Sequence, residues 1–356
     1  MTPRRRQLGI GCALAAVVVA VGVISVIRIG FFFPPPLARV PIQGPREASL
    51  DWDGDTLRVM VWNIQYCGSR QHHFFYDGGE TVEVPDADVE STLAAVASAI
   101  RSQNPDLVLL QEVDRDSDRT GRLDQLTAIL EQAPYDRWVA APYHRVRYVP
   151  HPPGQHLGRV DMELAILSRF ELTSAKRLQL PLLREPFYRR AFNLKRAVLE
   201  VTVPHPGGSL TVLDTHLSAF SYGDGTLEAQ VDRIQRRIAE LDRLGFPWLL
   251  AGDFNMLPPG DDPARLGDDA AMYPTGDNPI AELYEASSEA VPTAAAVADD
   301  PRAWRTYLPF GADVPDRTLD YLFTSANVTV TSAQVLHEYA EISDHLPLLV
   351  ELDVRR

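Results

Sequence analysis

Short apolar runs of strand length recur through the chain after Asp55, and turn-forming residues border them. They cover residues 57–62, 107–110, 164–167, 197–203, 210–213, 248–251 and 319–323. Apolar residues at helical spacing separate only some of these runs, over residues 89–100, 123–130 and 227–244. Because many neighbouring strands have no helix between them, the pattern predicts an α/β fold with mixed sheets rather than a regular strand–helix repeat.

The composition is that of an ordinary folded protein. The 356 residues are 45% hydrophobic and 23% charged, enough material for one large domain. The formal charge of −14 disfavours non-specific binding to nucleic acid, unless a basic patch or a bound cation intervenes. Only Cys12 and Cys67 are present, which excludes a disulfide framework and a cysteine-ligated zinc site.

Residues 258–300, rich in Asp, Pro, Gly and Ala, indicate a long loop with one short helix near residues 280–286.

The N-terminus carries a membrane signal. Residues 8–27 are 20 consecutive uncharged, mostly aliphatic positions, preceded by Arg4, Arg5 and Arg6. A helix of that length spans the roughly 30 Å hydrocarbon core of a bilayer. A cleaved signal peptide is the alternative, but bulky Phe and Pro residues follow the run where small residues would mark a cleavage site. We therefore expect an uncleaved single-pass anchor, with the N-terminus inside and the large domain outside the cytoplasm.

The sequence divides into three expected parts. Residues 1–33 form the anchor with its flanks, and residues 56–356 form the globular domain. Between them, residues 34–55 contain five prolines. Proline fixes an extended backbone, so this stretch is predicted to be a stiff spacer that lifts the domain off the membrane.

Polar residues end the apolar runs. The following residues stand at or just after such ends: Asn63, Gln111, Glu112, Asp214, Thr215, His216, Asp253, Asn255 and Asp320, with Asp344 and His345 preceding a further apolar run. Strands that share a sheet bring their ends together, so these side chains are expected to gather in one pocket. Phosphoester hydrolysis needs a cation, a base for water, donors for developing charge and an acid for the leaving group, and these residue types supply them.

The residue chemistry suggests a role for each group. Glu112, Asn63 and Asp344 offer the hard oxygen ligands that Mg²⁺ prefers, and Mn²⁺ is a second candidate ion. Asp253 and Asn255 are two apart, so on an extended chain they face the same side.

The imidazoles complete the set. His216 and His345 can donate to phosphate or exchange protons, and Asp320 could orient the His345 ring.

These motifs occur in a familiar order. The segments concerned are Trp62-Asn63-Ile64-Gln65, Gln111-Glu112, Thr215-His216-Leu217, Gly252-Asp253-Phe254-Asn255, Leu319-Asp320-Tyr321 and Ser343-Asp344-His345. In this order and over roughly residues 56–353, the chain resembles the endonuclease/exonuclease/phosphatase superfamily, with its DNase I-like fold. The resemblance implies a four-layer α/β sandwich of two mixed β-sheets flanked by helices, a divalent-cation site, and in-line attack of water on phosphorus.

The resemblance also implies a role for each of the eight site residues. By position, Glu112 is similar to the principal metal ligand with Asn63 beside it, Asp344 to a second metal-side carboxylate, Asp253 to the water-activating or leaving-group carboxylate, Asn255 to the transition-state donor, His216 to a phosphate-contacting histidine, and Asp320 with His345 to a paired dyad.

Three functions remain open at this point. The expected one is a membrane-anchored, Mg²⁺-dependent phosphoesterase, acting as a monomer outside the cytoplasm on a phosphate ester such as a lipid headgroup. The second is an extracytoplasmic endonuclease or exonuclease that degrades nucleic acid. The third is an inactive binding module on the same fold, but its expected mark, the loss of site residues, is absent here.

Overall fold

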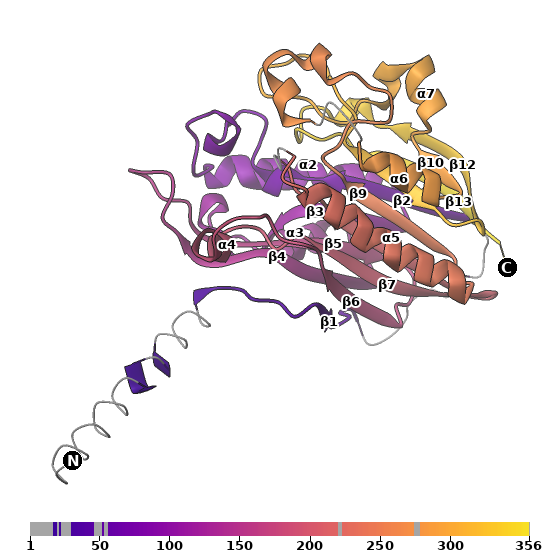
Figure 1. Cartoon of the computed structure of the whole chain (residues 1–356), viewed down its shortest axis with the longest axis horizontal. Helices are drawn as coiled ribbons and strands as arrows, with labels where there is room; N and C mark the ends of the chain where they lie inside the picture. The colour runs from indigo at the N-terminus through magenta and orange to yellow at the C-terminus, as the bar shows by residue number, and fades with distance from the viewer. Residues whose placement is uncertain are drawn as a thin grey trace, which may run out of the picture.

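The computed structural model describes residues 17–19, 21–22, 30–45, 52, 56–219, 223–273 and 278–355. Two mixed β-sheets pack face to face, and helices cover their outer surfaces (Figure 1). Side chains along a strand point alternately to the two faces of its sheet. In the seven-stranded sheet, Leu249 and Ala251 therefore face the other sheet, whereas Leu250 packs with the helix that covers the outer face. The predicted two mixed sheets flanked by helices are confirmed.

The seven-stranded sheet has the order β1-β6-β7-β8-β9-β11-β10. Its strands are β1 (Leu37–Arg39), β6 (Ser174–Gln179), β7 (Ala197–His205), β8 (Gly208–His216), β9 (Trp248–Asp253), β11 (Asp320–Thr324) and β10 (Glu289–Val291). Only β8 and β9 run parallel; the other pairs are antiparallel.

The six-stranded sheet has the order β12-β13-β2-β3-β5-β4. Its strands are β12 (Val328–Val335), β13 (Leu348–Val354), β2 (Thr56–Asn63), β3 (Leu107–Asp114), β5 (Gly158–Ser168) and β4 (Arg137–Val149). Here β2 and β3 are the parallel pair.

Helices α2 (Asp86–Gln103) and α3 (Gln125–Gln132) belong to the core of the six-stranded sheet, and α5 (Thr226–Leu244) and α6 (Ile280–Ala286) to that of the seven-stranded sheet. Two shorter helices are α4 (Phe187–Phe192) and α7 (Ala294–Asp299). Short 3₁₀ turns lie at Gln65–Cys67, Phe75–Asp77, Asp118–Thr120, Pro263–Met272, Pro301–Trp304 and His337–Tyr339.

The seven predicted strands and three predicted helices all form, and α6 covers the residues predicted for the short helix. Residues 258–300 are more ordered than the expected long loop, because they also form β10 and α7. The strands that sequence patterning missed are mostly at or near sheet edges. The edge strand β4, for example, carries Arg137, Arg145 and Arg147, which interrupt the apolar pattern.

Residues 31–45 and Trp52 pack against the domain, unlike the predicted spacer (Figure 1). Leu37–Arg39 is the edge strand β1, paired with β6, while Phe31 and Gln43 form bridges to β4 in the other sheet. Trp52 is 4% exposed and its ring stacks on Phe170 with centroids 5.7 Å apart. We call the described residues 31–45 the N-terminal strap, because they contact the edges of both sheets.

The predicted anchor at residues 8–27 lies largely outside the described residues, which include only 17–19 and 21–22 of it. Among the helices that the structure describes, none is long and apolar enough to cross a bilayer. The anchor stays a prediction.

The packing of Trp52 predicts that residues before 56 contribute to stability. Trp52→Ala should lower the free energy of unfolding by about 3 kcal/mol, the lower end of the usual cost of emptying a buried Trp site. Leu37→Ala is the control, because that side chain is 56% exposed and should change stability little. Urea unfolding followed by tryptophan fluorescence and circular dichroism measures both variants. Equal stability of Trp52→Ala and the unchanged protein would contradict the packing.

Candidate active site

Strand register brings three of the site residues to one edge of the seven-stranded sheet. His216, the last residue of β8, stands opposite Asp253, and Asp253 in turn stands opposite Asp320. In the six-stranded sheet, Asn63 at the end of β2 stands opposite Gln111. The site therefore lies where the ends of both sheets meet.

Gly252 allows β8 and β9 to approach at this edge. A Cβ atom at Gly252 would lie 1.9 Å from the carbonyl oxygen of Thr215, its partner on β8. The backbone φ angle of Gly252 is +140°, which other residues rarely adopt. A side chain here would separate the strands beside the neighbouring pair, His216 and Asp253.

A β-bulge turns Glu112 into the site. The register of β3 on β5 shifts between Leu110 and Val113, and Glu112 has a left-handed φ of 59°. Consecutive residues of a regular strand face opposite sides of a sheet, so Gln111 and Glu112 could not both face the second sheet without such an irregularity. Glu112 lines the cavity, while Gln111 donates from Nε2 to Asp214 Oδ1 of β8 at 2.7 Å.

A cavity of about 410 Å³ opens at the joined sheet ends. Seven of the eight predicted site residues line it: Asn63, Glu112, His216, Asp253, Asn255, Asp344 and His345. Asp320 is not among the lining residues, because it lies behind His345.

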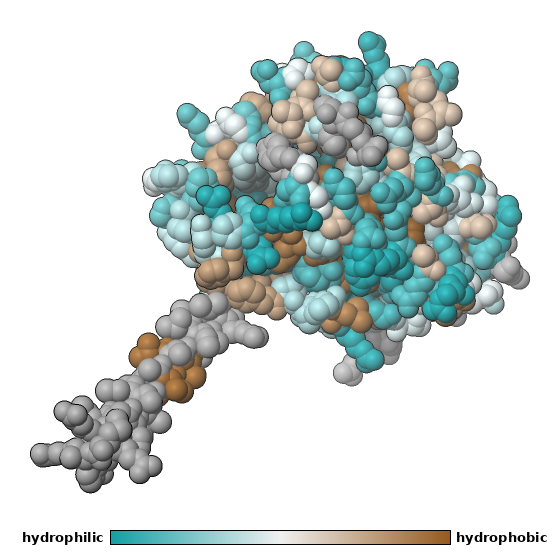
Figure 2. Space-filling view, viewed as in Figure 1, coloured by the Kyte–Doolittle hydropathy of each residue, from teal (hydrophilic) through white to brown (hydrophobic). Residues whose placement is uncertain are grey.

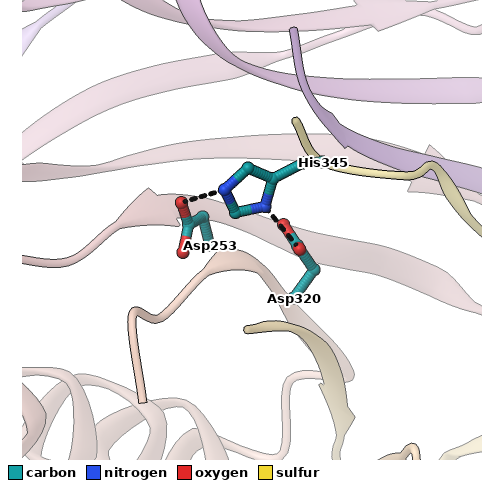
Figure 3. Close-up of side chains that lie close together, drawn as sticks. All are labelled: Asp253, Asp320 and His345. Carbon is teal, nitrogen blue, oxygen red and sulfur yellow. Dashed lines mark hydrogen bonds and ion pairs between the residues drawn. The ribbon is translucent and has the colours of Figure 1, made fainter. Parts of the chain in front are cut away.

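Asp320, His345 and Asp253 form a buried line of charge (Figure 3). His345 Nδ1 lies 2.7 Å from Asp320 Oδ2, and His345 Nε2 lies 3.5 Å from Asp253 Oδ2. Although burial opposes the charged ring, the two aspartates hold the pKa of His345 well above its usual value. Burial raises the pKa of Asp253 to about 6, while His345 acts in the opposite direction. At neutral pH the imidazolium thus faces an ionised carboxylate.

His216 joins Asp253 to the bulge at Glu112. The backbone N–H of Glu112 donates to the Tyr143 hydroxyl at 3.2 Å, and that hydroxyl lies 3.3 Å from His216 Nδ1. Burial lowers the pKa of His216 well below its usual value, so the ring is neutral. An ionised carboxylate can only accept, and His216 Nε2 lies 3.2 Å from Asp253 Oδ2, so the single ring proton is assigned to Nε2 and Nδ1 is left to accept from the Tyr143 hydroxyl.

Asn255 reaches the cavity by a turn rather than by an extended strand. β9 ends at Asp253, and Asn255 has a left-handed φ of 53°. Its backbone N–H donates to Asp253 Oδ1 at 2.9 Å, and its side-chain Nδ2 donates to the carbonyl of Leu217 at 3.1 Å. The expectation that both residues face one side of an extended chain is wrong, although both line the same cavity.

The oxygen-rich side of the cavity fits a hard divalent cation. Burial raises the pKa of Asp344 to about 7. The positive charge of His345 opposes this rise, and the negative charge of Glu112 adds to it. Burial likewise raises the pKa of Glu112. Within the part of the chain that the structure describes, the Glu112 carboxylate accepts no hydrogen bond, and the neutral His216 ring, whose Nδ1 lies 3.8 Å from Glu112 Oε1, supplies no compensating charge. Two carboxylates that repel each other and lack sufficient donors are suited to a cation, with Asn63 as a neutral oxygen ligand beside them.

A second group of ligand-type atoms is less suited to a metal. Atoms of Asp253, Asp320 and His345 lie within 4.8 Å of one another. Both ring nitrogens of His345 already face carboxylates, and the raised pKa of this ring means that a cation would have to displace a proton. This group is better suited to proton transfer.

Sequence analysis did not identify Tyr143, whose hydroxyl contacts Glu112 and His216, or Arg196, which lines the cavity. Tyr143 is the extra residue at a register shift between Pro142 and His144 of β4, so no period-2 pattern would have indicated its direction. Arg196 directly precedes β7 and lines the cavity. Its signal was visible, since a charged residue at the border of the apolar run 197–203 resembles the other strand-end polar residues.

Comparisons with known proteins agree with this fold. Solved structures that resemble the chain include an endonuclease/exonuclease/phosphatase from Beutenbergia cavernae, at 25% identity, a TM-score of 0.61, and coverage of 85% of this chain and 72% of that one. The human Nocturnin catalytic domain matches at 18% identity with a TM-score of 0.53, covering 88% of this chain and 97% of that one. Truncated TDP2 from Caenorhabditis elegans matches at 16% identity with a TM-score of 0.50, covering 85% and 99%.

No curated protein matches the chain by sequence. The model of the Endonuclease/Exonuclease/phosphatase family, however, matches residues 60–345, a span that runs from β2 to the site histidine His345. Since this match covers most of the chain, the protein belongs to the endonuclease/exonuclease/phosphatase family.

Proposed function

We propose that the protein is a divalent-cation-dependent phosphoesterase that hydrolyses its substrate by in-line attack of water. Members of its family are hydrolases that act on phosphoester bonds. The observation that carries the proposal is the proximity of an ionised carboxylate, a protonated imidazole and two poorly neutralised acids in one cavity. Together they provide a base, an acid and a cation site.

Glu112, Asn63 and Asp344 would hold the cation, for which Mg²⁺ is the first candidate and Mn²⁺ the second. A bound divalent cation would neutralise phosphoryl oxygens and so favour attack on phosphorus. The bulge at Glu112 fixes its carboxylate in the cavity, so the ligand position does not depend on an exposed, freely rotating side chain.

The remaining residues would move protons and hold oxygens. Asp253 is an ionised acceptor that can take a proton from water, and its Oδ2 is held by Asn63 Nδ2 at 3.0 Å. His345, kept protonated by Asp320, can donate to the phosphoryl group or to the leaving oxygen. The third function, an inactive binding module, is disfavoured because all eight residues of the predicted site are present.

A lipid surface is the favoured location of the substrate. Helix α4 exposes Phe187 (76%) and Tyr188 (57%) beside exposed Arg189 and Arg190. Aromatic and basic side chains together favour the interface of a bilayer with anionic lipid. The loop that follows α4 contributes Asn193 to the cavity, so this surface adjoins the candidate site.

The N-terminal residues support the same location. Val17, Val18, Val19 and Val21 are at least 56% exposed, and Figure 2 shows this hydrophobic group standing away from the domain. A bilayer would cover such a group, which supports the anchor and the extracytoplasmic domain as proposals. Hydrolysis of nucleic acid is the alternative, and substrate comparison tests it.

The cation proposal predicts loss of activity on chelation. With Mg²⁺, the protein should hydrolyse bis-p-nitrophenyl phosphate, and excess EDTA should abolish this activity. Glu112→Gln should weaken Mn²⁺ binding at least ~10-fold, because a charged ligand is lost, as measured by electron paramagnetic resonance. Glu131→Gln, the same change at an exposed position on α3, should leave binding unchanged. Full activity in EDTA would refute the cation role.

The proton-transfer proposal predicts an acid limb in the pH–rate profile. Asp253 accepts a proton only when ionised, so kcat should fall about tenfold per pH unit below its pKa of about 6. Asp253→Asn should lower kcat at least ~10²-fold and remove that limb. Asp299→Asn, an exposed change on α7, should keep the profile of the unchanged protein. An unaltered acid limb in Asp253→Asn would assign the titration to another group.

The lipid proposal predicts that α4 matters only at a membrane surface. The double change Phe187→Ser with Tyr188→Ser should reduce hydrolysis of sphingomyelin in anionic vesicles at least ~10-fold, because both apolar contacts are lost. Hydrolysis of bis-p-nitrophenyl phosphate should not change. Plasmid DNA, assayed in parallel, tests the alternative: rapid cleavage of DNA with inert vesicles would favour a nuclease.

A further inference from the structure

Arg196 is a buried cation that has no hydrogen-bonding or ion-pair partner for its guanidinium among the described residues. The residue is 8% exposed, and its Nη1 atom is buried without a hydrogen bond. Throughout the described residues, no hydrogen bond or ion pair involves its guanidinium. The guanidinium stacks over the Tyr143 ring, whose centroid lies 5.3 Å from the guanidinium carbon.

The other arginines of the cavity are different. Arg119 forms two hydrogen bonds with Asp114, at 2.8 and 2.9 Å. Arg317 pairs with Asp316 and Asp269, and Arg70 donates to the Leu308 carbonyl at 2.6 Å. These three have partners that hold them in place, so they are committed to the structure. Arg196 alone among the four retains a complete set of unused donors.

Arg196 lies on the reactive side of the cavity. It directly precedes β7, whose Val198 pairs with Thr215 of β8, so it stands at the sheet end that carries His216. Glu112 and Asp253 are close enough to influence its charge, yet neither forms an ion pair with it. In the proposed mechanism, Glu112 binds the cation and Asp253 accepts a proton. Neither is then available as a permanent partner.

Burial of an unpaired guanidinium is costly, because the cation loses hydration without gaining hydrogen bonds. Arginine stays charged even when buried, and its planar fork matches two oxygens of a phosphate or carboxylate. Hydrogen bonds to an oxyanion that enters the cavity would offset this loss of hydration. An unpartnered arginine in a hydrolase cavity therefore indicates where an anion binds.

We propose that the Arg196 guanidinium binds two non-bridging oxygens of the substrate's phosphoryl group on the His216 side of the cavity. The proposal rests on the proposed function, and it names Arg196 as the residue that recognises the reacting group. It further implies that the cavity binds a free oxyanion without a divalent cation, since Arg196 supplies its own charge.

Titration of inorganic phosphate into the detergent-solubilised full chain in EDTA, followed by calorimetry, tests this. The unchanged protein should bind phosphate, and Arg196→Met should bind at least tenfold more weakly. Arg196→Lys keeps a charge but loses the planar fork, so its affinity should lie between the two. Arg243→Met, at an exposed position on α5, is the matched control and should bind like the unchanged protein.

Kinetics with bis-p-nitrophenyl phosphate and Mg²⁺ provide a second readout. If Arg196 binds the phosphoryl group, Arg196→Met should raise KM at least tenfold and keep the acid limb of the pH profile. If its role is purely structural, the same change should lower the melting temperature and leave the phosphate affinity of the folded fraction unchanged. Absence of phosphate binding to the unchanged protein, or equal binding by Arg196→Met and Arg243→Met, would overturn the proposal.

Two further outcomes separate the proposals. Should Arg196→Met fail to fold, Arg196→Lys decides: affinity equal to that of the unchanged protein would overturn the bidentate assignment, and weaker affinity would support it. Phosphate binding that needs Arg196, in a protein that hydrolyses no phosphoester, would refute the proposed function and leave the anion site standing.

Discussion

A buried hydrogen bond between the two sheets fixes the distance on which the candidate site depends. Gln111 of β3 donates to Asp214 of β8 at 2.7 Å, and both side chains are fully buried. Glu112 follows the first of these residues and His216 lies two beyond the second. Burial raises the pKa of Asp214 well above its usual value, which favours the uncharged acid. The two sheets are thus joined by a buried polar contact.

The charges of the cavity follow from that arrangement. The six-stranded sheet contributes the oxygen ligands and, just before β13, the proton donor His345, whereas the seven-stranded sheet contributes the proton acceptor Asp253. Since the overall charge is −14, an anionic substrate would be repelled unless positive charge were concentrated at the site. Arg196, the protonated His345 and the proposed cation provide that concentration. These positive groups would offset the repulsion between the acidic protein and a phosphoester at the site.

The sequence was sufficient to predict the elements of the core, because apolar runs such as 248–251 are buried on both faces and interrupted by nothing polar. It also indicated seven of the residues that line the cavity, since polar groups at strand ends are conspicuous. It could not indicate directions that depend on irregular backbone. The inward turn of Glu112 and the position of Tyr143 both arise at register shifts, and a one-residue shift reverses the expected face. The strap was missed for another reason: prolines favour an extended chain, and an extended chain can equally be a free spacer or an edge strand.

The N-terminal strap gives the domain a mechanical property. Tension applied to the chain ahead of Phe31 would pass first to its bridge with β4 and to the Phe31–Phe192 ring contact, and then along β1. Because β1 lies antiparallel to β6, a pull along its axis loads several hydrogen bonds at once in shear, rather than opening them one by one. A domain held by its N-terminal end would keep a defined orientation relative to the attachment point instead of rotating freely. The α4 surface, which Phe31 contacts through Phe192, would then face the attached structure.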